Sequence, residues 1–365
     1  MSKTAETSPV LQGVLRRVVE GAEFRRLAAE VAAGARVVSV AGLTSAPARA
    51  LALAALQRET ARRFAVLVAA NRDMEDWERD LSFWCGALRT GAADCEAVLT
   101  LPASEGDPYA GASPHAETLE RRALSLWNLA RGRGGLVLLS SRALARRTVA
   151  PAQLLQAGAV LKRDEDFPPE DLVEVLLASG YVREDPVGAV GEFSMRGGIL
   201  DVWSPGEPAP VRVEFFGDTV DSIRRFNAET QLSIGQLQSA EVVPMRELTV
   251  GRDDFRLWAE FARDRWGDET HARALKDRTV YADEGETFPG WEWLVSLVAK
   301  SDASVFDYLR DTVLVVDEPA SVEQYLAGSF ETVAARYAEN DAAGEIGLRP
   351  EELYLTAEEL RRGLG

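Results

Sequence analysis

Strand-like and helix-like segments alternate between residues 9 and 147, and this alternation limits the fold more than any other feature of the sequence. Short apolar runs rich in branched residues are separated by longer segments with helical spacing of apolar residues. Strands separated by helices are joined by crossovers, so they form a mostly parallel sheet covered on both faces. The pattern predicts an α/β domain. Its expected strands are residues 37–42, 64–69, 97–101 and 136–140, and its expected helices are residues 11–33, 48–60, 74–83 and 117–130.

After residue 147 the rhythm changes, because short strands follow one another with glycine-containing turns between them. A predicted helix over residues 169–179 precedes them. The turns are Gly197-Gly198, Ser204-Pro205-Gly206 and Gly217-Asp218. Strands spaced this closely form an antiparallel meander, so we expect an inserted α+β domain. Its expected strands are residues 193–196, 199–203, 211–216 and 221–226.

The last third of the chain is mostly helical but contains one more apolar strand, predicted at residues 312–316, before a long helix at residues 320–338. A single late strand cannot form a sheet alone, so we expect it to join the first sheet. The predicted domains are residues 1–147 for the first part of the α/β domain, 148–241 for the insertion, 242–345 for the return segment that completes the α/β domain, and 346–365 for a linker.

Charge and hydropathy exclude several classes of function. The formal net charge is −17, and neutralisation of phosphates supplies most non-specific affinity for duplex DNA. No apolar run approaches the ~20 residues of a membrane-spanning helix. The start of the chain, MSKTAETSPV, lacks the layout of a signal peptide. We therefore expect a cytoplasmic protein with no membrane partner and no default affinity for DNA.

One segment has the strand, glycine, loop and helix layout of a phosphate-binding loop, with Gly42 and Thr44 in the loop. A working loop needs glycine amides, a lysine for the phosphates and a hydroxyl for magnesium. In an alignment on Gly42, these places hold Pro47, Ala48 and Arg49. Two interpretations stay open: a phosphate loop that has lost its chemistry, or an ordinary strand–helix turn that never bound a ligand. Neither predicts a cofactor or a catalytic residue.

The predicted strand at residues 312–316 ends in Asp317-Glu318. Nucleotide hydrolases use such a strand end to hold magnesium and position water. Acidic residues also cap a following helix, and Pro319 is a favoured first-turn residue. Capping is the favoured interpretation because no lysine–hydroxyl pair is present to share a metal. The histidines, His115 and His271, show no metal-ligand spacing with the cysteines, and no metal site is predicted.

Strand alternation gives the meander one apolar face and one mixed face. The inward residues are Phe193, Met195, Val211, Val213 and Phe215, and the outward residues are Ser194, Arg196, Arg212, Glu214 and Phe216. The mixed face combines arginine, a carboxylate and an aromatic ring, and arginine and aromatic residues are common anchors of protein interfaces. A solvated face with cross-strand ion pairs is the alternative.

The meander resembles a module that the excision-repair protein UvrB shares with the transcription-repair coupling factors. The segments that carry this resemblance are GEFSMRGGILDVW at residues 191–203, VRVEFFGD at residues 211–218 and DSIRRF at residues 221–226. Four further segments resemble the first domain of the coupling factors: Leu101-Pro102, Pro108-Tyr109, Ser113-Pro114-His115 and Glu120-Arg121. In the same region UvrB has an aromatic DNA-gripping hairpin instead. UvrB also keeps an intact phosphate loop, which this sequence lacks.

The resemblance implies a non-catalytic module that recruits UvrA by presenting the face that UvrB presents. The matching charged positions in the contact set are Arg183, Arg196, Arg212 and Glu214, and Phe216 shares their face by alternation. Ser194 stands where UvrB is basic, so the contact set here is expected to be thinner. We expect Arg196 and Arg212 to face solvent, and Arg224 to lie outside the contact set.

A full coupling factor is much longer and carries an RNA-polymerase-binding domain and a motor. The resemblance therefore implies that RNA polymerase and DNA are reached only through regions absent from this chain. Two other functions remain as alternatives. One is a UvrB-like DNA-damage-binding fragment, which the net charge and the missing hairpin oppose. The other is an atypical nucleotide hydrolase, which the missing lysine opposes.

Overall fold

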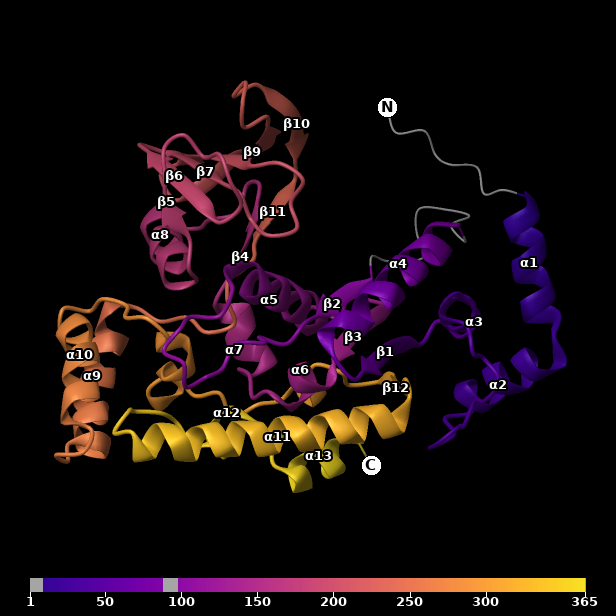
Figure 1. Cartoon of the computed structure of the whole chain (residues 1–365). Helices are drawn as coiled ribbons and strands as arrows, with labels where there is room; N and C mark the ends of the chain where they lie inside the picture. Colours follow the sequence, from indigo (N-terminus) through magenta and orange to yellow (C-terminus); the bar gives the residue numbers. More distant parts are fainter. Residues whose placement is uncertain (1–8, 88–97, 365) are drawn as a thin grey trace. The chain divides into compact units, whose positions relative to one another are not determined.

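The computed structural model describes residues 9–87 and 98–364. The chain divides into two compact units, each assembled from separate stretches of sequence. The first unit consists of Met1–Ala103, Gly132–Leu144 and Leu309–Ala327, and the second consists of Ser104–Arg131, Ala145–Tyr308 and Gly328–Gly365. The fold is α/β, with a parallel sheet in the first unit and a separate antiparallel sheet in the second (Figure 1).

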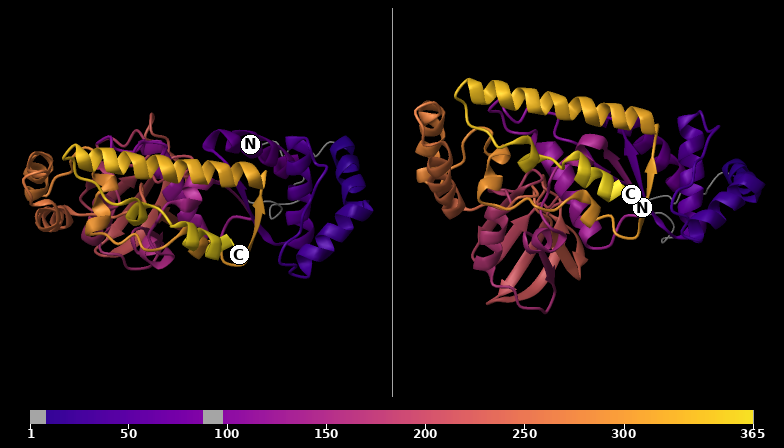
Figure 2. Two further views of the ribbon diagram at one scale, coloured as in Figure 1. Left: turned by 60° about the horizontal axis from the view of Figure 1, so that its bottom comes forward. Right: turned by 90° about the horizontal axis from the view of Figure 1, so that it is seen from below.

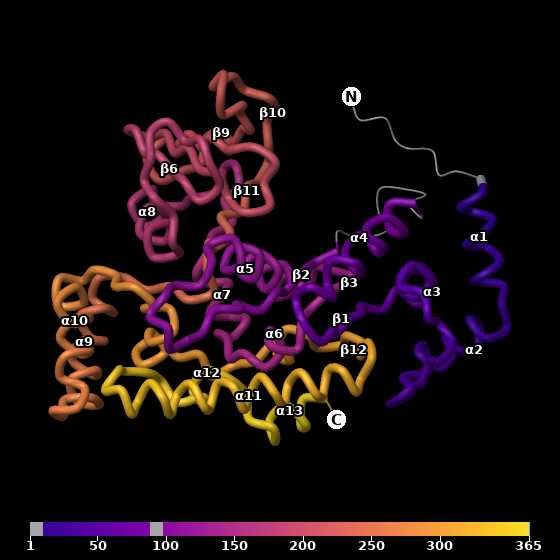
Figure 3. The backbone as a smooth tube through the Cα atoms, viewed as in Figure 1, coloured from indigo at the N-terminus to yellow at the C-terminus, as the bar shows by residue number. Residues whose placement is uncertain are grey.

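The first unit is built on a four-stranded parallel sheet in the order β12-β1-β3-β2. Its strands are β1 (Arg63–Val68), β2 (Leu99–Leu101), β3 (Leu136–Ser140) and β12 (Thr312–Val316). Strand β12 pairs with β1 in parallel, Arg63 opposite Thr312, so the prediction that the late strand joins the first sheet is confirmed. The tube in Figure 3 shows the return of the chain to this sheet through β12, and Figure 2 shows α11 continuing from that strand.

Four helices share the apolar core of this sheet: α1 (Pro9–Glu20), α2 (Ala22–Ala32), α3 (Ala46–Thr60) and α4 (Asn71–Ala87). Helix α4 contacts β1 and β3, α3 packs against α4, and α1 and α2 pack against α3. Strand β1 is almost completely buried, with Met74 and Trp77 of α4 in the same core. The sequence predicts one helix over residues 11–33, but Gly21 is extended and divides it into α1 and α2. Glycine has a poor intrinsic preference for helix interiors, which makes this break inexpensive.

The strand predicted at residues 37–42 is wrong, because the structure has no strand between α2 and α3. Val37 and Val40 are 83% and 54% exposed. Branched residues favour strands mainly by packing on a pleated, half-buried surface. Without a neighbouring strand and an apolar face, the local preference of this segment is not enough to form one.

The second unit contains a six-stranded sheet in the order β10-β9-β8-β7-β6-β5. Its strands are β5 (Val182–Arg183), β6 (Glu192–Arg196), β7 (Ile199–Val202), β8 (Val211–Phe216), β9 (Thr219–Phe226) and β10 (Ser233–Leu237). Strands β6 to β9 form the predicted antiparallel meander, and β10 extends it by a strand that the sequence analysis did not predict. The predicted limits of the inserted domain, residues 148–241, stay a prediction. Strands β4 (Ala159–Lys162) and β11 (Ser239–Val242) pair separately.

Helices make up most of the rest of the chain. They are α5 (Ala116–Ala130), α6 (Ser141–Ala145), α7 (Pro151–Gln156), α8 (Pro169–Ala178), α9 (Arg252–Trp266), α10 (Ala272–Asp283), α11 (Pro319–Ala342), α12 (Pro350–Leu353) and α13 (Ala357–Leu364), with short 3-10 turns at Trp291–Trp293, Val295–Leu297 and Val305–Asp307. Leu172 and Leu176 of α8 enter the core beneath the antiparallel sheet. None of the described helices is long and apolar enough to cross a membrane.

Helix α13 begins with a capping box that an arginine reinforces. The Thr356 amide donates to the Glu359 carboxylate at 2.8 Å, and Arg147 Nη2 donates to both carboxylate oxygens at 2.8 Å. These bonds lower the pKa of Glu359 from 4.5 to about 2. The carboxylate is therefore held in its charged form over nearly the whole pH range in which the protein would be studied.

Glu359→Gln should reduce the free energy of unfolding at neutral pH, with a difference that shrinks in acid. Because the folded-state pKa lies below the unfolded value, this stabilisation is present above about pH 4.5 and is lost as the pH falls toward 2. The side chain is 34% exposed, so solvent screening limits the contribution to about 1 kcal/mol. Urea unfolding at pH 7 and pH 3 measures it. A difference that is constant with pH, or matched by the exposed control Glu358→Gln, would contradict the assignment.

Candidate functional site

The outer face of the six-stranded sheet carries two rows of side chains from residues that pair directly across strands. The first row is Ser194, Asp201, Arg212 and Arg224, and the second is Arg196, Ile199, Glu214 and Ser222. The opposite face packs into the core through Phe193, Leu200, Val213 and Ile223. This is the division between faces that strand alternation predicts, and it places Arg196, Arg212 and Glu214 on one surface.

Asp201 is the centre of the first row. Its side chain is 3% exposed, and its carboxylate accepts hydrogen bonds from Arg212 Nε at 2.6 Å and Arg212 Nη2 at 2.7 Å. Arg196 Nη2 donates to the same carboxylate at 3.1 Å. Sequence reasoning missed Asp201, although its spacing from Ile199 puts it on the outer face. The buried carboxylate orients both arginines.

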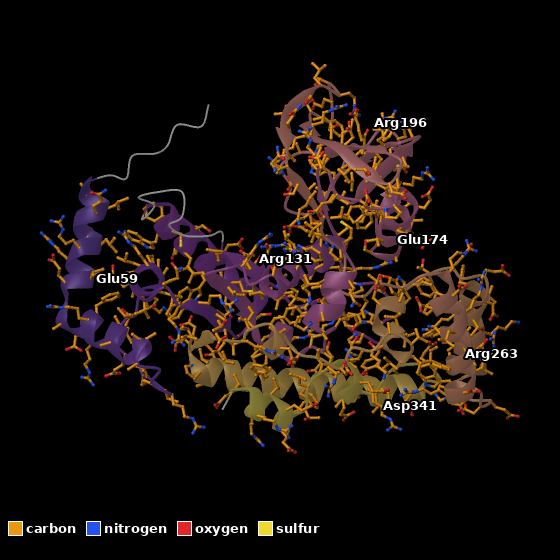
Figure 4. The ribbon with its side chains drawn as sticks, turned by 180° about the vertical axis from the view of Figure 1, so that it is seen from behind. Glu59, Arg131, Glu174, Arg196, Arg263 and Asp341 are labelled. Atoms are coloured by element: carbon orange, nitrogen blue, oxygen red, sulfur yellow. The ribbon has the colours of Figure 1, made fainter. Side chains whose placement is uncertain are left out.

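Arg212 is not the solvent-facing side chain that the sequence predicts, since only 17% of it is exposed. Its guanidinium lies 4.6 Å from the centre of the Phe226 ring, and Nη2 donates to Gln231 Oε1 at 3.1 Å. The hydrogen bond to Asp201 is the main cause that raises the pKa of Arg212. Arg196 behaves as expected: it is 53% exposed and visible on the sheet in Figure 4.

Glu214 is held by two neighbours on β9. Ser222 Oγ donates to it at 2.8 Å and Arg224 Nη2 at 2.6 Å, and these bonds lower the pKa of Glu214. Arg224 pairs with Arg212 across the strands, so it lies on the same face. Because Arg224 lies on the face assigned to UvrA, it cannot serve as a control for general charge loss, and whether it belongs to the contact set stays a prediction.

Two apolar side chains stand among these charges. Phe216 is 85% exposed beside the turn at Gly217, where φ is +61°, and Ile199 is 37% exposed opposite Glu214. Arg183 does not belong to these two rows. It lies on the edge strand β5 and pairs with Phe193 of β6, whose side chain faces the core. Its Nη2 donates to the Met195 carbonyl at 3.2 Å. We call the exposed residues of the outer face the outer patch: Arg196, Ile199, Glu214, Phe216 and Arg224.

The outer patch carries groups that suit recognition of a partner. Arginine forks donate to carboxylates, and an exposed ring can bury apolar area in a partner's pocket. Within the described part of the chain, no group of three or more histidine, cysteine, aspartate or glutamate side chains is placed to hold a metal ion. Exposed arginines beside an exposed ring are the kind of residues that anchor protein–protein contacts.

The acidic end of β12 is held by side chains from α3 and α4. Arg49 Nη1 donates to Asp317 Oδ1 at 2.6 Å and lies 3.3 Å from Glu318 Oε1, and Trp77 Nε1 donates to Asp317 Oδ2 at 2.8 Å. Asp317 is 16% exposed. Both carboxylate oxygens of Asp317 therefore accept hydrogen bonds from side chains of α3 and α4. The carboxylate ties the end of β12 to these helices instead of capping the helix that follows, as the sequence predicted it would.

Polar groups at the start of α3 are also engaged in hydrogen bonds within the protein. Ser45 accepts from the Ala48 amide at 3.4 Å, and Trp84 Nε1 donates to the Pro47 carbonyl at 3.0 Å. Gly42, with φ of +89°, and Thr44 lie in the exposed segment before the helix. Sequence reasoning missed both tryptophans, because an aromatic residue on an amphipathic helix does not indicate where its indole N–H donates.

Comparison with known proteins gives independent evidence on this sheet. Residues 160–248 match the family model of the UvrB interaction domain, and all of the outer patch lies within them. The chain is also similar to the transcription-repair-coupling factors of Myxococcus xanthus (33% identical over 307 residues, 81% of this chain and 25% of that protein) and Haemophilus influenzae (31% over 273 residues, 73% and 23%). The same protein of Escherichia coli is 27% identical over 271 residues (72% and 23%).

The chain spans about a quarter of the length of these relatives, and each match covers most of this chain. They extend well beyond the UvrB interaction domain, which occupies residues 160–248 alone. Over most of its length the chain is therefore similar to about a quarter of the transcription-repair coupling factors, and its residues 160–248 match the UvrB interaction domain.

Proposed function

We propose that this chain recruits UvrA through the outer patch and has no catalytic activity of its own. The observation that carries the proposal is the position of the patch: a solvent-exposed set of arginines and a phenylalanine lies inside the region that matches the UvrB interaction domain. Arg196 and Arg224 keep part of their guanidinium groups accessible while Asp201 and Glu214 orient them. Side chains that are held in place lose less conformational entropy when a partner binds.

In this function the chain acts by mimicry. It presents to UvrA a face like the one that UvrB presents, so that a complex stalled on DNA can attract repair proteins. Contacts with RNA polymerase and with DNA belong to regions that this sequence does not include. The formal net charge of −17 is compatible with a chain that binds UvrA but not DNA, because the outer patch needs only local positive charge.

Titration calorimetry with the cognate UvrA tests this function directly. We expect saturable binding to the purified chain, with weaker binding at higher salt because arginines contribute. No detectable heat or complex at tens of micromolar protein would contradict recruitment by this chain. Variants that locate the binding face are considered in the Discussion.

We propose in addition that the segment before α3, although no strand precedes it, corresponds to a phosphate loop that has lost its chemistry. Arg49 stands where the magnesium-binding hydroxyl would be, and it bonds directly to the acidic strand end that would share the metal. Pro47 has no amide to donate, and Ala48 has no ammonium group. The ion pair between Arg49 and Asp317 therefore takes the place of the magnesium ion that a nucleotide site would need between the loop and the acidic strand end.

Mg-ATP should give no binding heat with this chain, and the purified protein should not accelerate ATP hydrolysis above the rate in buffer. The physical reason is that the loop lacks both the lysine and the hydroxyl, while Arg49 already occupies the carboxylate of Asp317. Calorimetry and a phosphate-release assay measure the two quantities. A micromolar ATP site would show that another group replaces the lysine.

A further inference from the structure

The six-stranded sheet of the second unit has an open edge at strand β10 (Figure 1). Among the described residues no strand pairs with the outer side of β10, and its residues Ser233 to Gln236 are exposed. Two apolar side chains, Leu232 and Ile234, are 70% and 63% exposed there. An edge strand carries a row of unpaired N–H and C=O groups, which can pair with a strand of another chain.

Strand β10 lacks most of the features by which proteins protect such an edge, namely charged side chains, prolines, bulges and short length. The opposite edge strand, β5, has two residues and carries Arg183. By contrast, β10 has five residues, and residues 230–238 contain neither a charged side chain nor a proline. A shift of register between Ser233 and Gly235 is present. The edge is therefore open to pairing over most of its length.

The pairing of β10 with β9 shows which backbone groups point to the open edge. The Phe226 amide donates to the Pro210 carbonyl at 3.0 Å, so the backbone groups of Phe226 point toward β8 and away from β10. Arg224, two residues earlier, points the same way. Ser233 lies opposite Phe226, and Gln236 lies opposite Arg224. Directly opposed residues either bond each other or both point away, so the N–H and C=O groups of Ser233 and Gln236 point to the open edge.

This edge is continuous with the outer patch. Gln236 pairs with Arg224, which belongs to that patch, so Gln236 extends the first row of the outer face by one residue. Ser233 pairs with Phe226, whose ring lies against the guanidinium of Arg212. Neighbouring strands lie only about 4.8 Å apart. A partner that covers Arg224 therefore reaches the edge of β10 within one further strand.

We propose that an extended segment of UvrA pairs with β10 and adds a further strand to the sheet, a contact that rests on the proposed recruitment of UvrA through the outer patch. The backbone groups of Ser233 and Gln236 form hydrogen bonds with this segment, and Leu232 and Ile234 supply apolar area beside it. The arginines of the outer patch select the partner by charge. Strand β10 adds affinity through main-chain groups, which depend little on the partner's side chains.

Gln236→Pro tests the pairing, because proline has no N–H to donate and its ring occupies the open edge. The preceding residue is Gly235, which tolerates the backbone restriction that a following proline imposes. We expect the Kd for UvrA, measured by titration calorimetry, to rise about tenfold while the melting temperature stays unchanged. The matched control is Gln236→Ala, which removes the same side chain but keeps the N–H, and it should bind like the unmodified chain.

Hydrogen exchange of the unmodified chain gives a second measurement that needs no variant. The amides of Ser233 and Gln236 should exchange rapidly in the free chain and about tenfold more slowly in the complex with UvrA. Slower exchange at both amides supports strand addition even if Gln236→Pro does not fold.

Three results would overturn strand addition while leaving recruitment intact. The first is equal UvrA affinity of Gln236→Pro and Gln236→Ala, and the second is unchanged exchange of the two amides in the complex. The third is a dimer of the chain alone that Gln236→Pro abolishes without changing the UvrA affinity, which would make a second copy the occupant. Absence of UvrA binding by the unmodified chain would instead contradict the proposed function, and strand addition with it.

Discussion

Arg212→Met should reduce the free energy of unfolding of the second unit by about 3–4 kcal/mol, the largest effect expected of any single change on the outer face. The variant keeps an unbranched side chain that can pack on Phe226, but it removes both hydrogen bonds to Asp201. The carboxylate of Asp201 is 3% exposed and would retain only Arg196, at 3.1 Å. Urea unfolding followed by circular dichroism measures the loss.

Two further variants test the cause of this loss. Arg224→Met removes a comparable charge from a pair with Glu214 whose partners are 30% and 31% exposed, and it should cost less than about 1 kcal/mol. Asp201→Asn combined with Arg212→Met removes the buried charge and should recover part of the stability. Equal losses for Arg212→Met and Arg224→Met would show that the buried carboxylate does not dominate.

Phe216→Ala should weaken binding to UvrA by about 2 kcal/mol, or roughly thirty-fold in Kd, while leaving the melting temperature unchanged. The ring is 85% exposed, so it contributes almost nothing to the core of the free chain. In a complex it would be the largest apolar group of the outer patch. Arg196→Ala, at 53% exposure, should weaken binding in the same direction through loss of charge-assisted hydrogen bonds.

Matched controls separate the outer patch from general surface effects. Phe261→Ala removes an aromatic ring that is 42% exposed on α9, and Arg256→Ala removes an exposed arginine from the same helix. Both should bind UvrA like the unmodified chain. If the chain binds UvrA but Phe216→Ala and Arg196→Ala bind equally well, recruitment stands and the outer patch is the wrong face.

Arg212 shows why a contact residue cannot be chosen from strand alternation alone. Alternation correctly puts it on the outer face, and the resemblance matches it to a contact position. The structure adds that its guanidinium is covered by Phe226 and Gln231 and bonded to a buried carboxylate. A loss of UvrA binding in Arg212→Met would therefore mix lost contact with lost folding, whereas Phe216 and Arg196 separate the two.

Local patterns in the sequence determine most of the strands and the division of the meander into two faces. Strands β3, β8 and β12 begin and end where apolar runs and turn residues predict, because a period of two and a turn both depend on neighbouring residues. The turn at Gly197-Gly198 places Arg196 opposite Ile199, and hence Ser194 opposite Asp201. That register is readable from the sequence once the hairpin is accepted.

Tertiary structure alone decides which polar groups meet and which segments find a partner. Arg49 and Asp317 are 268 residues apart, and no local period relates them. Residues 37–42 have the composition of a strand but form none and are largely exposed, whereas β12, which is one residue shorter, is paired with β1. Whether a charge is buried with a partner and whether a strand is paired both depend on residues far away in the sequence. They are therefore decided by the tertiary contacts of the folded chain and not by local preference.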